Sequence, residues 1–159
     1  MKVRDFMIKD VLTVNQNAPL SEVLQLFVAK RINGAPVVDA DGKLTGMVSD
    51  GDILRYINPT RQTVYDMFSY VFVSPPEELA EALAYKVETP AKKIMKKNVQ
   101  SVSPEQDLEE ALGILAKHHF KKLPVVNEKK EVVGVISRGD LLKQIAGRLN
   151  ELNAKTVSR

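Results

Sequence analysis

The sequence predicts an α+β protein built from two copies of one β-α-β-β-α unit. When the chain is shifted by 88 residues against itself, residues 3–55 align with residues 91–143 without a gap, and 15 of the 53 aligned positions are identical. The apolar positions keep their phase, which indicates one supersecondary unit used twice. Two copies are too few for an open solenoid, so we expect a closed pair with pseudo-two-fold symmetry and small three-stranded sheets packed with helices.

Each unit opens with a short β-prone stretch, Val11–Val14 in the first copy and Val99–Val102 in the second. A helix is predicted to follow. Apolar residues recur from Leu20, and again from Leu108, at the i, i+3, i+4, i+7 and i+8 spacing of a one-sided helix. The two copies therefore begin with the same pair of elements.

The two predicted helices begin differently. In the second copy, Asp107 and Glu110 have the three-residue spacing of a capping box, in which side chains satisfy free N–H groups of the first turn. In the first copy Pro19 stands at that place, and its fixed φ suits a first helical turn.

Two strands and a turn are predicted after each helix. Residues 36–38 and 124–126 read Pro-Val-Val, and because proline lacks an N–H it is expected at a strand start or a sheet edge. A turn follows, which in the first copy is Asp-Ala-Asp-Gly, with a glycine for positive φ. Residues 44–48 and 132–136 then form the second strand, and each unit ends by entering a helix.

The segment between the copies is not repeated. It is rich in aromatic residues, and after two prolines an apolar stripe predicts a helix from Glu77 to about Val87. The segment either packs as a connector across the module or contacts a partner or a second copy. The aromatic side chains available for such a contact are Tyr65, Phe68, Tyr70 and Phe72.

These observations divide the chain into four parts. Residues 1–58 form the first repeat, residues 59–90 the linker with its helix, and residues 91–152 the second repeat. The last helix is predicted to continue through Leu152. The polar residues 153–159 are expected to fray from it and to be mobile.

Length and composition limit the class of protein. With 159 residues the chain can bury a stable core, and its 44% apolar and 27% charged residues are ordinary for a soluble globular protein. The absence of cysteine excludes disulfides, thiolate zinc sites and cysteine nucleophiles. No apolar run approaches a membrane span and the N-terminus leaves no room for a signal peptide, so we expect a cytoplasmic protein without a membrane partner.

The most informative short motif is Gly-x-x-Ser-x-Gly-Asp, at residues 46–52 and 134–140. A strand ends at a serine, and three residues later an aspartate opens a helix. Such a pair can form a helix N-cap. A hydroxyl and free N–H groups at a helix start can equally bind a phosphate or a ribose, and a nearby aspartate accepts hydrogen bonds from a vicinal diol. The two interpretations are compatible.

The order of these motifs and their double occurrence resemble the CBS (cystathionine-β-synthase) domain, and the tandem pair resembles a stand-alone Bateman module. The resemblance covers both repeats, about two thirds of the chain. It implies that the cleft between the repeats binds an adenine nucleotide of the AMP, ADP or ATP class, as a regulatory ligand and not as a catalytic cofactor. It also implies a homodimer of head-to-head pairs that signals to another, unidentified effector protein.

The resemblance also carries the family's site residues over to this chain. Asp52 and Asp140 would hold the ribose, and Ser49 and Ser137 would bind ribose or phosphate. The hydroxyl before the first helix of each copy corresponds to Thr13 and Ser101. The apolar slot and backbone edge around the adenine correspond to Ile32, Ala35, Val37, Phe120, Leu123 and Val125.

Two departures make the sites unequal. Asp50 of the first copy is Arg138 in the second, and the stretch before Pro-Val-Val is strongly basic only in the second copy. The resemblance implies that this stretch faces the phosphates of the ligand. Lys121, Lys122 and Arg138 are therefore expected to pair with ligand phosphate. The alternative is a solvated helix end, where cations are favoured. The adjacent histidines of the stretch lack further ligands at a recognisable spacing, so no metal site is predicted.

Other functions have less support in the sequence. An enzyme is not expected and no catalytic residue is assigned, because the chain has no cysteine, no Gly-rich P-loop and no Ser/His/Asp arrangement. The net charge of +3 and the basic stretch permit nucleic-acid binding, but no helix-turn-helix or RNA motif supports it. The remaining alternatives are a dimerisation module with vestigial sites and a module that binds S-adenosylmethionine.

Overall fold

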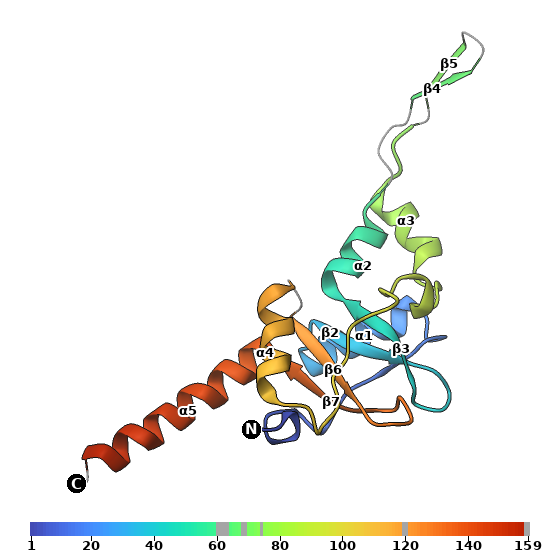
Figure 1. Ribbon diagram of the computed structural model, residues 1–159. Coiled ribbons are helices and arrows are strands. Elements are labelled where there is room, and N and C mark those ends of the chain that lie inside the picture. The colour runs from blue at the N-terminus through green and yellow to red at the C-terminus, as the bar shows by residue number, and fades with distance from the viewer. Residues whose placement is uncertain (60–63, 68–69, 74, 119–120, 158–159) are drawn as a thin grey trace. The chain divides into compact units, whose positions relative to one another are not determined.

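The computed structural model describes residues 1–59, 64–67, 70–73, 75–118 and 121–157, and it has the predicted α+β architecture (Figure 1). The first copy contains β1 (Val14–Asn15), α1 (Leu20–Lys30), β2 (Gly34–Val38), β3 (Leu44–Ser49) and α2 (Asp50–Ile57). The second contains α4 (Leu108–Lys117), β6 (Lys122–Val126), β7 (Val132–Ser137) and α5 (Arg138–Val157). Each copy begins with a 3-10 turn, at Val3–Asp5 and at Ala91–Lys93.

The strands form small sheets. One has three strands in the order β1-β2-β3, and in the other β6 and β7 pair antiparallel. The first strand of each copy is shorter than predicted. β1 begins only at Val14, and in the second copy a single bridge joins Val102 to Val125. Val14 and Val102 are the first residues of these stretches whose side chains are buried, so pairing begins where the chain enters a core.

The prolines of the Pro-Val-Val strands lie further inside their strands than predicted. Pro36 is the third residue of β2, the middle strand of its sheet, so the expected position at a strand start or an edge is wrong there. In the second copy the Pro124 carbonyl oxygen accepts from the Val102 N–H at 3.1 Å. The N–H and C=O groups of one strand residue point to the same side, so the N–H that Pro124 lacks would face the Val102 bridge and not β7. The β7 ladder therefore loses no hydrogen bond.

The linker contains a hairpin and a helix. β4 (Val64–Met67) and β5 (Tyr70–Val73) pair antiparallel, and α3 spans Leu79–Lys86, which confirms the predicted helix with slightly shorter ends. The Lys86 ammonium lies 5.4 Å from the centre of the Tyr56 ring, and the Tyr56 hydroxyl is 2.7 Å from Oγ1 of Thr89. These contacts attach α3 to α2. Of the linker aromatics considered for a partner contact, Phe68 lies outside the described residues.

The chain forms two compact units, and each unit combines segments of both repeats. The first-repeat unit contains residues 14–37 and 45–97, and the second-repeat unit contains residues 1–13, 38–44 and 98–159. Val3 and Phe6 join the buried core of the second-repeat unit, and Ala91 joins that of the first-repeat unit. We call residues 3–8 of the first repeat and residues 91–96 of the second the leading segments. Each leading segment therefore contributes to the core around the sheet of the other repeat.

Paired backbone hydrogen bonds attach these leading segments to the strands. Ile8 exchanges two hydrogen bonds with Val135 of β7, at 2.9 and 3.1 Å. Lys96 exchanges two with Met47 of β3, at 2.9 and 3.0 Å. The 88-residue repeat makes the two bridges equivalent, and a glycine precedes the bridged strand residue in both copies. The leading segment crosses directly over that glycine.

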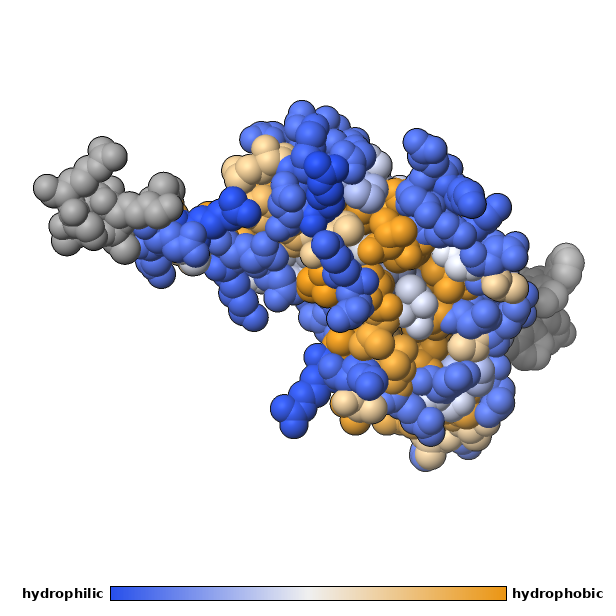
Figure 2. All heavy atoms as spheres, turned by 90° about the horizontal axis from the view of Figure 1, so that it is seen from below, coloured by the Kyte–Doolittle hydropathy of each residue, from blue (hydrophilic) through white to orange (hydrophobic). Residues whose placement is uncertain are grey.

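The last helix is longer than predicted. α5 runs for 20 residues to Val157, past the point at which a mobile polar tail was expected to begin. Its exposed apolar side chains include Leu142 and Leu149. Figure 2 shows that apolar residues reach the surface on the face in view, with hydrophilic residues around them. No helix in the described part of the chain is both long enough and apolar enough to cross a bilayer.

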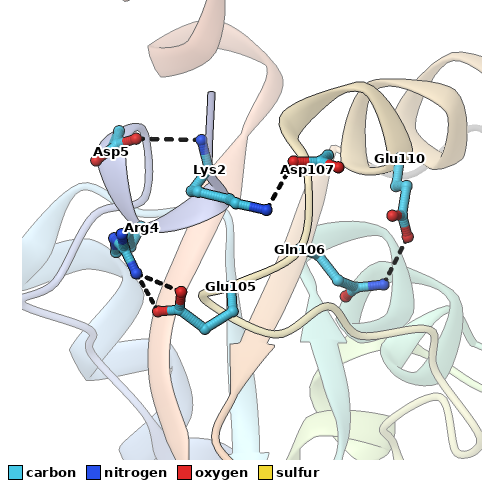
Figure 3. Close-up of polar contacts among 7 residues, drawn as sticks. All are labelled: Lys2, Arg4, Asp5, Glu105, Gln106, Asp107 and Glu110. Carbon is cyan, nitrogen blue, oxygen red and sulfur yellow. Dashed lines mark hydrogen bonds and ion pairs between the residues drawn. The ribbon is translucent and has the colours of Figure 1, made fainter.

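The capping box predicted for α4 does not form. Asp107 is the N-cap residue but makes no side-chain capping bond, and its carboxylate accepts from the Lys2 ammonium at 2.8 Å instead (Figure 3). Glu110 accepts from the Gln106 amide at 2.8 Å. A second ion pair, between Arg4 and Glu105, lies beside the first. The prediction fails because a lysine directly before the leading segment competes for the capping carboxylate.

At each bridge the leading segment lies so close to the glycine that an added Cβ would collide with it. Substitution of these glycines by alanine should therefore destabilise the fold, by different amounts in the two repeats. A Cβ at Gly46 would lie 2.5 Å from the Lys96 carbonyl oxygen, so Gly46→Ala should destabilise the fold by about 1–3 kcal/mol. At Gly134 the Cβ would lie 2.6 Å from the movable Met7 sulfur and 3.2 Å from the Ile8 carbonyl oxygen, so the loss should be smaller. The matched control is Gly113→Ala in α4, which meets open space and should add about 0.5–1 kcal/mol. Urea unfolding measures all three, and equal effects would contradict the bridge geometry.

The Lys2–Asp107 ion pair predicts an acid-dependent contribution to stability. The hydrogen bond from Lys2 lowers the pKa of the Asp107 carboxyl below its usual 3.8, so the pair stabilises the fold above that pH and is lost as the pH falls through the lowered pKa. Asp107→Asn should therefore lower the urea midpoint at pH 7 slightly, and the difference from wild type should vanish on acidification. Glu109→Gln, an exposed neighbour on α4, is the control and should show no such pH dependence. A constant difference from pH 7 to pH 3 would disprove the pairing.

Candidate functional site

The first-repeat site is the pair Ser49 and Asp52, where β3 ends and α2 begins. Ser49 is the N-cap residue, and the Asp52 N–H donates to its Oγ at 3.3 Å. Oδ2 of Asp52 accepts from the Ser49 N–H at 3.0 Å and from the Ser49 hydroxyl at 2.8 Å. The predicted N-cap is thereby confirmed, as a complete capping box.

The second-repeat site is the equivalent pair, Ser137 and Asp140, at the end of β7 and the start of α5. The Ser137 hydroxyl donates to Oδ2 of Asp140 at 2.5 Å and accepts from the Asp140 N–H at 3.1 Å. The same residue pair therefore forms the same local contact in both repeats. The local fold is set by the strand that ends at the serine and by the need of the first helical turn for acceptors.

The two carboxylates differ in their second oxygen. Oδ1 of Asp52 accepts from Nη2 of Arg55 at 2.7 Å, and the aspartate side chain is only 6% exposed. Oδ1 of Asp140 forms a longer ion pair with the Lys143 ammonium, at 3.8 Å, and the Asp140 side chain is 40% exposed. The first carboxylate is thus fully occupied by the protein, whereas the second keeps an oxygen that can accept from a ligand.

Arg55 and Lys143 were missed by the sequence analysis. They occupy equivalent positions, three residues after each aspartate, and the i, i+3 spacing of opposite charges on a helix was the signal available. Arginine presents a planar donor group that reaches the carboxylate, whereas lysine offers a single flexible ammonium. The carboxylate paired with arginine is the more buried of the two.

The basic residues predicted to face phosphate lie close to the second-repeat site. The Arg138 N–H donates to the Lys121 carbonyl oxygen at 3.0 Å, and Lys122 pairs with Ser137 across the β6–β7 ladder. The Arg138 guanidinium donates to the carbonyl oxygens of Leu115 at 2.5 Å and His118 at 2.8 Å, at the end of α4. The structure therefore places Lys121 and Lys122 beside the serine and the start of α5, with Arg138 held by α4.

The residues predicted to surround an adenine lie mostly inside the cores. The side chains of Ala35, Val37, Leu123 and Val125 are fully buried in their respective cores. Ile32 is half-buried and packs against the core of the first-repeat unit. Phe120 lies outside the described residues.

The two predicted hydroxyl positions fall in one unit. Thr13 is exposed and follows the N-terminal leading segment, and Ser101 is half-buried directly before Val102. Both belong to the second-repeat unit, which also contains Ser137 and Asp140. Whether either hydroxyl contacts a ligand stays a prediction.

A separate cavity of about 440 Å³ lies in the second-repeat unit, and none of the predicted site residues lines it. Most of the side chains that line it are apolar and come from the N-terminal segment, α4 and α5. Two charged residues of α5, Arg148 and Glu151, also line it. The guanidinium of Arg148 lies 4.6 Å from the centre of the Phe6 ring. In the described ranges, no three His, Cys, Asp or Glu side chains gather in a way that could hold a metal ion.

Comparison with protein families matches the CBS domain twice, at residues 3–59 and 91–147. The two matches coincide with the two halves of the internal repeat. The sequence is 29% identical over 158 residues to the protein MJ1426 of Methanocaldococcus jannaschii, covering 91% of each chain. Other relatives are longer, and the chain spans 42% of one of them.

Solved structures resemble this fold over nearly its whole length. The AcuB protein of Vibrio cholerae superimposes with a TM-score of 0.74 at 30% identity, covering 98% of this chain and 96% of that one. CBSX2 of Arabidopsis thaliana in complex with AMP superimposes with a TM-score of 0.71 at 25% identity, covering 92% and 96% of the two chains.

Proposed function

This chain belongs to the CBS-domain family, with one domain in each repeat, and we propose that it is a regulatory module that binds an adenine nucleotide. The observation that carries the proposal is the second-repeat site. There an aspartate that is 40% exposed and a serine hydroxyl stand at the start of α5, beside Lys121 and Lys122. A carboxylate and a hydroxyl suit a ribose, and the cations and helix start suit a phosphate.

The comparison with CBSX2 supports the class of ligand. That protein is named as a complex with AMP, and its fold covers most of this chain. An adenine nucleotide combines a vicinal diol, which suits the carboxylate and hydroxyl of the second-repeat site, with a phosphate, which suits its cations. We therefore place AMP, ADP or ATP ahead of ligands that lack one of these groups.

The proposed role is regulation of another protein. A ligand shifts a conformational equilibrium only by the difference between its affinities for the two states. Ligand contacts at the start of α5 would change the relative stability of the conformations of this helix, which carries the exposed Leu142 and Leu149. A partner that binds this helix would then respond to nucleotide.

We also propose that two copies associate through α4 and α5. Leu142 and Leu149 are 66% and 55% exposed, and the apolar cavity described above opens between these helices and the N-terminal segment. Exposed leucines beside an apolar hollow are costly to leave in water and are typical of an interface. A homodimer would cover them without requiring a second kind of chain.

Nucleotide binding predicts a rise in thermal stability and a specific loss on mutation. Ligand at 100 times its Kd should add about 2.7 kcal/mol, which for a chain of this length raises Tm by roughly 5–11 °C. Asp140→Ala should weaken binding about 10- to 150-fold in calorimetry, because a hydrogen bond to a charged group is lost. Asp41→Ala, an exposed aspartate of the same unit, is the matched control and should bind like wild type. Absence of any Tm rise with AMP, ADP and ATP would refute the proposal.

The proposed dimer predicts a change of mass in solution. Wild type should elute as a dimer in size-exclusion chromatography with light scattering, and Leu142→Asp with Leu149→Asp should elute as a folded monomer. Both leucines are exposed in the single chain, so the substitutions should leave the circular dichroism spectrum unchanged. Leu79→Asp, an equally exposed leucine on α3, is the control and should remain dimeric. A monomeric wild type would contradict the proposal directly.

A further inference from the structure

We infer that the two sites sort ligands by charge: the second-repeat site takes the phosphorylated nucleotide, and the first-repeat site excludes a phosphate. The inference rests on the proposed function, since it states which of the same two sites takes the phosphorylated ligand. It is carried by three differences at equivalent positions of the repeats. Each difference removes either the space or the positive charge that a phosphate needs at the first-repeat site.

The first difference is the residue that opens the helix. α2 begins with Asp50, whose Oδ1 accepts from the Gly51 N–H at 2.7 Å, whereas α5 begins with Arg138. The positive end of a helix dipole attracts anions through its free N–H groups. In α2 one of these groups is already occupied by an aspartate, and the same carboxylate repels a phosphate. In α5 the equivalent side chain is a cation.

The second difference is the space over the first helical turn. A Cβ at Gly51 would lie 3.2 Å from Nη1 of Arg55, because the guanidinium folds back over this glycine to reach Asp52. Among the described residues, a Cβ at Gly139 would meet nothing within 4 Å. The first helical turn of α2 is therefore covered by the arginine that also binds the carboxylate. In the described part of the chain, no side chain covers the first turn of α5 in this way.

The third difference is the pair of residues at the start of the preceding strand. Asn33 and Gly34 stand where the second repeat has Lys121 and Lys122. The backbone is the same, since the Asp50 N–H donates to the Asn33 carbonyl oxygen at 2.9 Å, as the Arg138 N–H does to that of Lys121. Two neutral residues and an acid thus replace three cations. A phosphate dianion meets attraction at the second-repeat site and repulsion at the first.

The experiment titrates the full-length protein with AMP and, separately, with adenosine, by calorimetry. Wild type should bind one AMP per chain. Lys121→Glu should weaken AMP about 10-fold or more, because a charge-assisted contact becomes a repulsion, and should change adenosine affinity by less than about 3-fold. Lys129→Glu, an exposed lysine in the β6–β7 turn, makes the same charge change and should bind both ligands as wild type does.

A gain-of-function variant tests the other half of the inference. Asp50→Arg with Arg55→Gln removes the acid and uncovers Asp52, so the stoichiometry should rise from one AMP per chain to two. Two AMP of similar affinity in wild type, or a single AMP insensitive to Lys121→Glu, would overturn the sorting and leave the proposed function standing. No binding of AMP or adenosine to wild type would overturn the proposed function, and the sorting with it.

Discussion

Two backbone bridges, Ile8 with Val135 and Lys96 with Met47, are the constraint on which the rest of this structure depends. At each bridge the leading segment of one repeat crosses a glycine in the other repeat, Gly134 of β7 or Gly46 of β3. The cores follow from this exchange, because Phe6 is buried in the second-repeat unit and Ala91 in the first. Neither sheet has a complete core without a segment of the other repeat, so the two repeats must fold together. The bridges also fix the strands whose last residues are the serines of the two sites.

The two candidate sites share one local motif but differ in how far the aspartate side chain is available to a ligand. The serine and aspartate make the same capping contact in both repeats, so the motif is explained structurally before any ligand is considered. What differs is the free acceptor capacity of the carboxylate. Arg55 occupies it at Asp52, in surroundings where the aspartate is nearly buried, and a ligand would have to replace a charged hydrogen bond there. At Asp140 the lysine is exposed and its ion pair is longer, at 3.8 Å, so a ligand would displace a weaker contact there.

The sequence predicts the elements of this fold well because they depend on local periodicity. The helical stripes from Leu20 and Leu108 and the strands after Pro36 and Pro124 are all present, since each pattern reports which face of its own element is buried. The errors concern partners far along the chain. The capping box at Asp107 fails because Lys2 competes for the carboxylate, and no local pattern contains that information. The segment exchange is missed for the same reason. The Arg55 contact is local, and it is missed because the i, i+3 spacing of opposite charges occurs on many helices.

The proposed charge selection at the second-repeat site would not require the fold to rearrange. The Arg138 guanidinium is held by the last carbonyl oxygens of α4, at Leu115 and His118, and this contact also stabilises the helix end. A charge fixed in this way still attracts a phosphate, because electrostatic interactions extend over about 8–10 Å at physiological ionic strength. Lys121 is exposed beside it and can make the direct contact. Arg138 would therefore both stabilise the end of α4 and attract a phosphate, while the exposed Lys121 side chain would contact the ligand directly. Selection by charge would then not reduce the stability of the unit.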